Sequence, residues 1–261
     1  MLAPRSAMEN KPQEKHAREG IEPHTGLVAV FDLLGFRKII SQDDVAASIS
    51  LIQEAFRRRV GETIRFPGHS VMTGYNPSFV PEYLIFADTI LLHTPTPGTM
   101  HPECVRLFFV QHCCRLMALL FSNGLPARGG ITSGKYFVGD NCFAGKPIVD
   151  AEELGKRLKL SGCKVSSELQ TEFMVDQDIA KLFFNHITPG GKEAEMLLNY
   201  LPLVPDFESL TKDQVERQFL AHGKTLDAKS RPKFDNTWSF VEHSKQVLHS
   251  SPYSDVPPLQ G

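Results

Sequence analysis

Hydrophobic residues in the first half of the chain gather into runs that predict strands and one long helix. Residues 27–31 are continuously apolar and partly β-branched, which predicts a buried strand over 26–32. Two shorter apolar runs flank Asp88 and predict a tight hairpin over 83–93, with Asp88 at or near its turn. The stretch 102–122 is apolar on most of its face and predicts a core helix.

Turn-forming residues and weaker periodicity divide the rest of the chain. They predict a helix after the capping residues Ser41 and Asp44, and a long loop over 61–79 that is rich in Gly and Pro. The later elements are expected to be two strands around Gly134 within 127–138, a helix over 148–160, edge strands at 163–165 and 173–175, and helices over 212–222 and 236–248. The order β-α-β-β-α-β-β-α predicts an α+β protein with a ferredoxin-like antiparallel sheet and helices on one face.

Composition narrows the class of protein. The chain has 261 residues, of which 41% are hydrophobic and 22% charged, as is typical of a globular protein. We expect one domain over 25–249, including a C-terminal extension, between disordered tails at 1–24 and 250–261. The net charge of −2 gives no basic field, so neither nucleic acid nor a membrane is expected as a partner. Five cysteines and a polar N-terminus that resembles no signal peptide predict a cytoplasmic protein.

Two acidic residues carry the clearest chemical signal. Asp32 ends the first predicted strand, where a carboxylate is unusual, and Gly35 follows where the backbone can approach a ligand closely. Asp32 alone can equally be interpreted as a cap of the next turn. In a ferredoxin-like sheet, however, Asp32 and Asp88 meet at one end of the sheet. Two carboxylates repel unless cations lie between them, and two divalent ions so held are the usual arrangement for attack on a phosphoryl group.

Arginines supply candidate phosphate ligands. Arg128 enters a predicted strand, where its guanidinium can either hold a phosphate or pair with a carboxylate. The run Arg57–Arg59 closes a predicted helix, where cations complement the C-terminal end of the helix. For that run we favour a solvated helix end over a phosphate site.

Four short blocks occur in order along the first two thirds of the chain. They are Val30-Phe-Asp32-Leu-Leu-Gly35-Phe36, Phe86-Ala-Asp88, Arg128-Gly-Gly-Ile-Thr-Ser-Gly134 and Phe143-Ala-Gly-Lys-Pro-Ile-Val-Asp-Ala-Glu-Glu-Leu154. In order and spacing these blocks resemble the successive motifs of class III nucleotidyl cyclases. The closer resemblance is to the bacterial pyrimidine cyclases of the Pycsar anti-phage systems, and it covers about residues 26–165.

The resemblance implies roles for several residues. Asp32 and Asp88 are expected to bind two divalent ions, Mn²⁺ or Mg²⁺, with help from the carbonyl of Leu33. The triphosphate is expected to contact the backbone around Gly35 and Phe36 and the side chain of Arg128. Enzymes of this family work as head-to-tail homodimers with their sites at the interface, so a homodimer is expected here.

Three positions depart from the purine cyclases of this family. The base-reading Lys is replaced by Leu84, and the transition-state Asn and Arg are replaced by Val149 and Glu153. This argues against an ordinary adenylate cyclase and fits the pyrimidine group or a catalytically silent relative. Tyr83, beside Leu84, can offer a hydroxyl to a smaller base. Strand alternation would point Tyr83 away from Asp88, and packing on the sheet is an equally good interpretation of this aromatic residue.

The missing transition-state Arg needs a catalytic substitute. Arg157 lies four residues after Glu153, about 6 Å further along the same helix face, and its long guanidinium can span part of that distance. Lys146, at the helix entrance, is a second candidate. The alternative is that Arg157 pairs with Glu153 on a solvated surface, as i,i+4 ion pairs commonly do.

We therefore expect a uridylate cyclase that converts UTP to 3′,5′-cyclic UMP and pyrophosphate, a second messenger in anti-phage defence that acts on a separate effector. CTP as substrate, giving cyclic CMP, is the near alternative. A silent cyclase-like domain that binds a nucleotide as a regulatory module is disfavoured by the retention of both Asp residues. A diguanylate-cyclase or polymerase-palm-like transferase shares the strand order, but the sequence has no Gly-Gly-Asp-Glu-Phe turn and no charge suited to a template.

Overall fold

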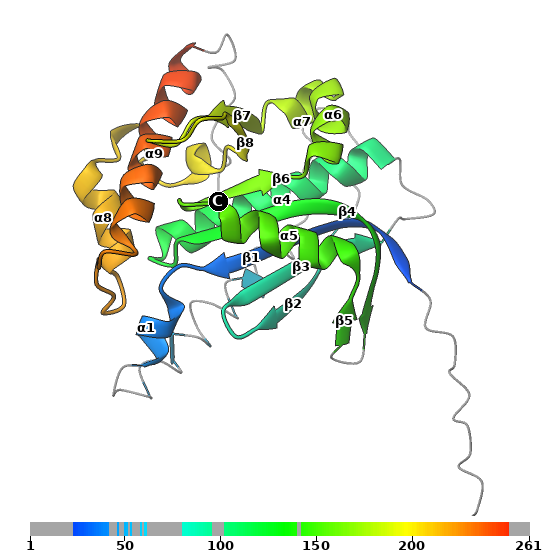
Figure 1. Cartoon of the computed structure of the whole chain (residues 1–261), viewed down its shortest axis with the longest axis horizontal. Coiled ribbons are helices and arrows are strands. Elements are labelled where there is room, and N and C mark those ends of the chain that lie inside the picture. The colour runs from blue at the N-terminus through cyan, green and yellow to red at the C-terminus, as the bar shows by residue number, and fades with distance from the viewer. Residues whose placement is uncertain are drawn as a thin grey trace, which may run out of the picture.

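The computed structural model describes residues 23–41, 80–95, 102–139 and 142–250, with isolated positions between 46 and 61 (Figure 1). Most of the helix predicted after Ser41, the loop predicted over 61–79 and nearly all of both predicted tails lie outside the described residues. The described part of the chain is α+β, as predicted, and is built on an eight-stranded sheet.

The strands are β1 (His24–Leu33), β2 (Glu82–Phe86), β3 (Thr89–Pro95), β4 (Ala127–Gly139), β5 (Cys142–Ala144), β6 (Gly162–Val165), β7 (Phe183–His186) and β8 (Glu195–Leu198). They follow the order β2-β3-β1-β4-β6-β8-β7, and β5 pairs with β4 beside this path. The predicted antiparallel pairing is confirmed except between β4 and β6, which run parallel.

β1 is the central strand on which the candidate site is built. It lies between β3 and β4, and its register pairs Asp32 with Thr89 on one side and with Arg128 on the other. The predicted hairpin is present as β2 and β3, with Ala87 and Asp88 forming its turn. The strand order therefore places Asp88 next to the end of β1.

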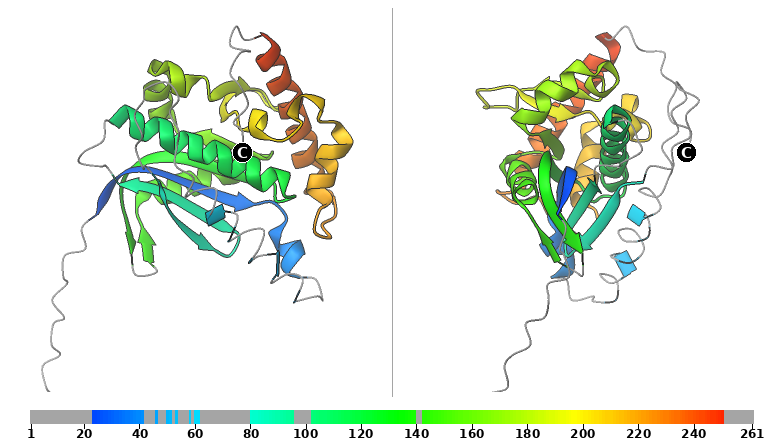
Figure 2. Two further views of the ribbon diagram at one scale, coloured as in Figure 1. Left: turned by 180° about the vertical axis from the view of Figure 1, so that it is seen from behind. Right: turned by 90° about the vertical axis from the view of Figure 1, so that its right-hand side faces the viewer.

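Helices cover both faces of the sheet (Figures 1 and 2). The side chain of Phe31 packs into the main core with α4 (Pro102–Ser122), whereas Val30 packs with α5 (Lys146–Arg157) on the opposite face. The expectation that the helices lie on one face is therefore wrong. The physical reason is the continuous apolar run of β1, which presents hydrophobic side chains on both sides and needs cover on both.

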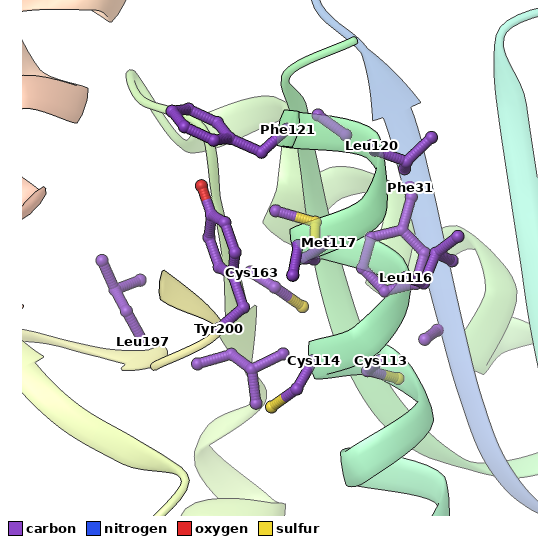
Figure 3. Close-up of a cluster of buried hydrophobic side chains, with 14 of the residues drawn as sticks. Phe31, Cys113, Cys114, Leu116, Met117, Leu120, Phe121, Cys163, Leu197 and Tyr200 are labelled. Carbon is purple, nitrogen blue, oxygen red and sulfur yellow. The ribbon is translucent and has the colours of Figure 1, made fainter. Parts of the chain in front are cut away.

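α4 is the core helix predicted from the sequence. By length and composition it could cross a membrane, but 67% of its most apolar stretch is buried inside the protein. Figure 3 shows α4 between Phe31 of β1 and Tyr200, with Leu116 in the same cluster. All five cysteines are free, and burial raises the pKa of Cys114 on this helix to about 12.

Four predicted strands differ from the structure. The two strands expected around Gly134 are one strand, β4, which continues through Gly134 with φ 150°. Residues 163–165 form β6, but this strand lies inside the sheet rather than at its edge. Residues 173–175 belong to the end of α6 (Ser167–Val175). The last error arises because a short apolar run does not distinguish a strand from part of a buried helix.

The C-terminal region packs beside β6 and α4. The hairpin of β7 and β8 was not predicted, whereas the two last helices were, although the final one begins at Arg231 rather than at 236. The ring of Phe240 on this helix stacks on Phe184 of β7, with centroids 5.1 Å apart. The described residues also form α1 (Phe36–Ile40), α7 (Gln177–Ala180), η2 (Leu201–Leu203), η3 (Phe207–Ser209), α8 (Lys212–Leu220) and α9 (Arg231–Ser250).

The contact between β7 and α9 is expected to be sensitive to acid. His186 on β7 is buried, and its Nδ1 lies 3.1 Å from Nδ1 of His243 on α9. Burial, and then the charge of His243, lowers the pKa of His186 from 6.5 to about 4. Below pH 6.5 the unfolded chain therefore binds more protons than the folded protein. The contribution of neutral His186 to the free energy of unfolding is present above pH 6.5 and is lost as the pH falls toward 4. Calorimetry should show a loss on the order of 2 kcal/mol between about pH 7 and pH 5.

The control for this prediction is His186→Phe. The variant keeps an aromatic ring against Phe184 and Phe240 but has no group to protonate. Its Tm should change less between neutral and acidic pH than that of the wild type. Equal changes in the two proteins would show that His186 does not cause the acid sensitivity.

Candidate functional site

The end of β1 and the turn between β2 and β3 bring Asp32 and Asp88 to the same end of the sheet. The backbone N–H of Leu33 donates to the carbonyl oxygen of Asp88 at 3.1 Å, so the turn is fixed to the residue after Asp32. Ala87 has φ 50°, a value that non-Gly residues adopt mainly in tight turns. Asp32 and Asp88 therefore lie at the same end of the sheet, as predicted, and both residues are partly buried.

Arg128 pairs with Asp32 across β1 and β4. Its Nε and Nη2 donate to Oδ2 of Asp32 at 3.0 and 2.9 Å, and its Nη1 donates to the carbonyl oxygen of Lys156 at 2.9 Å. Of the two partners that the sequence left open, phosphate or carboxylate, this structure shows the carboxylate. Burial raises the pKa of Asp32, Arg128 opposes this rise, and the charge of Asp88 adds to it.

The oxygen atoms at this end of the sheet suit a hard divalent cation. Both hydrogen bonds from Arg128 go to Oδ2 of Asp32, which leaves Oδ1 and the Asp88 carboxylate as donors to a cation. Across the described residues, no three His, Cys, Asp or Glu side chains are placed to hold a metal together. A cation here would need the Leu33 carbonyl, water or substrate phosphates as further ligands, which is how Mg²⁺ is usually bound. The residues present fit such an ion.

The turn after β1 is held in place by the backbone. Leu34 donates its N–H to the carbonyl oxygen of Pro126 at 2.8 Å, which ties the turn to the segment before β4. Gly35 has φ 81° and ψ 12°, in the left-handed region that favours glycine. Phe36 is buried in the main core. The sharp turn that was predicted beside Asp32 is therefore present.

A C-terminal segment, residues 222–227, packs against this turn, and we call it the C-terminal clamp. Lys38 of α1 donates to the carbonyl and hydroxyl oxygens of Thr225, at 2.7 and 3.1 Å, and its Nζ lies 2.8 Å from Asp227. Lys224 is buried within the clamp. Sequence reasoning missed these residues because they lie in a stretch of weak periodicity, and no short motif marks them.

α9 brings a further cation, Lys233, near Asp32. Burial lowers the pKa of Lys233, the charge of Arg128 lowers it further, and the charge of Asp32 opposes both effects. The Asp32 carboxylate therefore lies in the field of two cationic side chains, one from β4 and one from α9. The sequence gave no sign of Lys233, because only the packing of α9 brings it here.

The two residues predicted to bind the base lie on opposite sides of β2. Tyr83 packs against the main core, and a Cβ added at Gly61 would lie 2.8 Å from its hydroxyl. Leu84 packs instead against the smaller cluster under α5. This placement favours the packing interpretation of Tyr83. Leu84 lies on the sheet face that α5 covers only in part.

Arg157 lies at the end of α5 in an exposed ion pair with Glu153. Nη2 of Arg157 is 3.2 Å from Oε2 of Glu153, and the two side chains are 75% and 58% exposed. Lys146, at the start of the helix, pairs with Asp150 at the same i,i+4 spacing. Exposed pairs of this kind are weak, so the guanidinium of Arg157 can leave Glu153 at little cost.

No family model and no curated protein matches the sequence. Among solved structures, the chain is similar to the adenylyl cyclase CyaB from P. aeruginosa, with 15% identity and a TM-score of 0.42 over 68% of this chain and 95% of that one. It is also similar to the catalytic core of a rhodopsin-guanylyl cyclase with converted specificity, in complex with ATPαS, with 13% identity and a TM-score of 0.46 over 67% and 94% of the two chains.

A third similar structure is a class III adenylyl cyclase-like ATP-binding protein from Pseudomonas aeruginosa, with 11% identity and a TM-score of 0.44. The match covers 88% of this chain but only 44% of that protein. At such low identities and TM-scores, these likenesses carry no information about the substrate or the catalytic residues of this chain.

Proposed function

We propose that this protein is a nucleotidyl cyclase that converts UTP to 3′,5′-cyclic UMP and pyrophosphate. The observation that carries the proposal is that Asp32 and Asp88 lie at the same end of the sheet, beside the turn at Gly35. Two carboxylates so placed are costly unless a cation or a proton reduces their repulsion. The motif blocks that resemble class III cyclases contain both aspartates and the glycine.

Two divalent cations, Mn²⁺ or Mg²⁺, held by Asp32, Asp88 and the carbonyl of Leu33 would lower the pKa of the attacking hydroxyl and neutralise the leaving phosphates. The 3′-hydroxyl gives up its proton to water and attacks the α-phosphorus in line, one P–O bond forms, the bond to the β-phosphate oxygen breaks, and pyrophosphate leaves. The chain itself contributes position and charge. The turn at Gly35 limits where the triphosphate lies, and Arg128 supplies a guanidinium that can exchange Asp32 for a phosphate oxygen.

The choice of a pyrimidine follows from residues that purine cyclases have and this chain lacks. Leu84 replaces their base-reading Lys, so this position offers no hydrogen bond to a purine edge. Val149 and Glu153 replace the transition-state Asn and Arg, and both are exposed on α5. We therefore infer that a different cation, for which Arg157 is the first candidate, stabilises the transition state.

The direct test is to incubate purified protein with each of the four nucleoside triphosphates and Mn²⁺ and to identify the products by mass spectrometry. We expect cyclic UMP as the main product, with pyrophosphate released in equal amount. Cyclic CMP as the main product would identify the near alternative, a cytidylate cyclase. A cyclic purine nucleotide would contradict the substrate class. No cyclic product from any nucleotide would favour a silent domain that binds a nucleotide for regulation.

An apolar surface on the α5 side of the sheet supports a head-to-tail homodimer. Phe86, at the end of β2, is 68% exposed and shares a sheet face with Leu84, because the two lie two residues apart on one strand. Phe143 of β5, which pairs with Val138, and Val149 of α5 are also exposed. Large exposed apolar side chains mark interaction surfaces when they gather on one side of a protein. A second copy of this chain is the partner that the family resemblance implies.

Phe143→Glu tests this dimer. A carboxylate at that position would have to be desolvated in the interface, so the variant should be mainly monomeric by light scattering and should lose most activity at low concentration. Val175→Glu, at the exposed end of α6, is the matched control and should leave the dimer intact. A wild-type protein that is strictly monomeric and fully active at low concentration would rule out the dimer.

The resemblance to Pycsar cyclases supports a place in cell defence. We infer that cyclic UMP serves as a second messenger against phage in the cytoplasm and acts on a separate effector protein. The expected partners are thus UTP and a second copy of the chain, with neither nucleic acid nor a membrane. Loss of phage resistance in cells that carry an inactive Asp88 variant is the expected result in vivo.

A further inference from the structure

Lys224 of the C-terminal clamp carries a buried charge. Only 5% of the residue is exposed, and its Nζ donates to the carbonyl oxygen of Gly124 at 2.6 Å. Burial lowers the pKa of Lys224 to about 8, so the ammonium group stays mostly protonated at neutral pH. No carboxylate in the described part of the chain pairs with it. A buried cation without a counter-charge costs folding free energy, and such groups concentrate at functional sites.

The side chain of Lys224 lies against the turn that follows β1. A Cβ added at Gly35 would be 3.1 Å from Cδ and 3.8 Å from Cγ of Lys224. The aliphatic stem therefore fills the space that a side chain at position 35 would need. Beyond this contact, the ammonium group reaches Gly124, at the turn between α4 and β4. Lys224 thus joins two turns that lie far apart in the sequence.

Other contacts hold the clamp without the charge of Lys224. The ring Nε2 of His222 lies 2.7 Å from the carbonyl oxygen of Asn123. On the other side of Lys224, Thr225 accepts two hydrogen bonds from Lys38 of α1. Because these contacts do not involve the ammonium group, the clamp should keep its conformation when only that group is removed.

We propose that Lys224 is a positioning residue for the polyphosphate of the substrate: its stem packs against the Gly35 turn, and its buried positive charge lies beyond this contact, at the carbonyl oxygen of Gly124. The inference rests on the proposed function, in which this turn holds a nucleoside triphosphate. The ammonium group is bonded to the Gly124 carbonyl, so it acts through the turn and its field. Solvent screens a buried charge less than an exposed one, which makes this position effective for attracting an anion.

Calorimetric binding of inorganic triphosphate, with Mg²⁺ present, tests the proposal without turnover. Lys224→Met keeps a stem against Gly35 and removes the charge, so we expect an affinity about tenfold lower than that of the wild type. The KM for the nucleotide should rise by a similar factor, with a smaller change in kcat. Lys224→Arg should restore most of the affinity. The Tm of Lys224→Met should equal or exceed that of the wild type, because a buried unpaired charge has been removed.

Lys245→Met is the matched control. Nζ of Lys245 donates to the carbonyl oxygen of Leu210 at 2.7 Å, a contact of the same kind made from α9. Lys245 is not among the residues within 4 Å of the added Cβ at Gly35. Its replacement should leave triphosphate binding unchanged. If the Lys224→Met protein does not fold, Lys224→Gln removes the same charge with a polar end.

Unchanged triphosphate affinity in the neutral variants of Lys224 would overturn the inference, and so would a wild-type protein that binds no triphosphate. A lower Tm with wild-type affinity would reduce Lys224 to a structural residue. Failure of the proposed function gives a different result. In that case no nucleotide yields a cyclic product, while triphosphate binding still depends on Lys224.

Discussion

Asp32→Ala and Asp88→Ala should each lower cyclic nucleotide formation by about a thousandfold or more, with the fold intact. Each variant removes one of two carboxylates that the β1–β3 register places together, and the remaining one cannot hold both cations. The measurement is the rate of product formation with Mn²⁺. Circular dichroism and Tm report the fold, and Mn²⁺ binding followed by electron paramagnetic resonance reports the metal site separately from activity.

Asp32→Asn separates the charge of Asp32 from its contact with Arg128. The amide oxygen can still accept hydrogen bonds from the guanidinium, so this variant should be more stable than Asp32→Ala and equally inactive. Asp178→Ala removes a surface carboxylate that pairs with Lys181, and it should keep full activity. Near-normal Mn²⁺-dependent activity in either alanine variant at the paired aspartates would exclude the two-metal assignment.

The centre of the fold was predictable because its signals are local. The strand predicted over 26–32 is present as β1. The helix predicted over 102–122 is α4, which has the same bounds. The turn at Asp88 was also predicted, because two apolar runs on either side of a polar residue leave few arrangements other than a hairpin. From these elements, known strand-order rules were enough to bring Asp32 to Asp88.

Elements whose identity depends on distant packing were missed. The short strands β7 and β8 have four residues each, too few for a periodic pattern. Residues 173–175 have the apolar character of a strand but lie in a helix, because Phe173 packs in the core from α6. The second covered face of the sheet could have been inferred from the unbroken apolar run of β1, which requires burial on both sides.

The contacts of charged residues around the site also depend on distant packing and were hard to predict from the sequence. Arg128 was identified as a ligand for either a phosphate or a carboxylate, and only the β1–β4 register shows that Asp32 is its partner. Lys224 and Lys233 come from the C-terminal region, and no local pattern connects either of them to the end of β1. Such contacts depend on how the last helices pack. Local patterns in a single sequence do not predict that packing.

Arg157→Ala is expected to lower kcat on the order of a hundredfold with little change in KM. In the proposed cyclase, Glu153 would occupy the position of the usual transition-state Arg, and Arg157 is the cation four residues further along the same helix face. The preceding residue, Lys156, accepts a hydrogen bond from Arg128 at its carbonyl, so the end of α5 lies beside the Asp32–Arg128 pair. In the proposed reaction an exposed guanidinium can turn from there toward the charge that develops at the α-phosphate, in its own protomer or across the proposed dimer.

Steady-state kinetics of Arg157→Ala beside Lys156→Ala makes the test specific. Lys156 forms the same kind of i,i+4 pair with Glu152, so its replacement changes the surface charge equally without removing the candidate. Wild-type kcat in Arg157→Ala, with a stability change of about 0.5 kcal/mol or less, would assign Arg157 to a surface pair and turn attention to Lys146 and Arg128. A fall in kcat at constant KM would place the lost interaction in the transition state, because an interaction made equally in the ground state would raise KM instead.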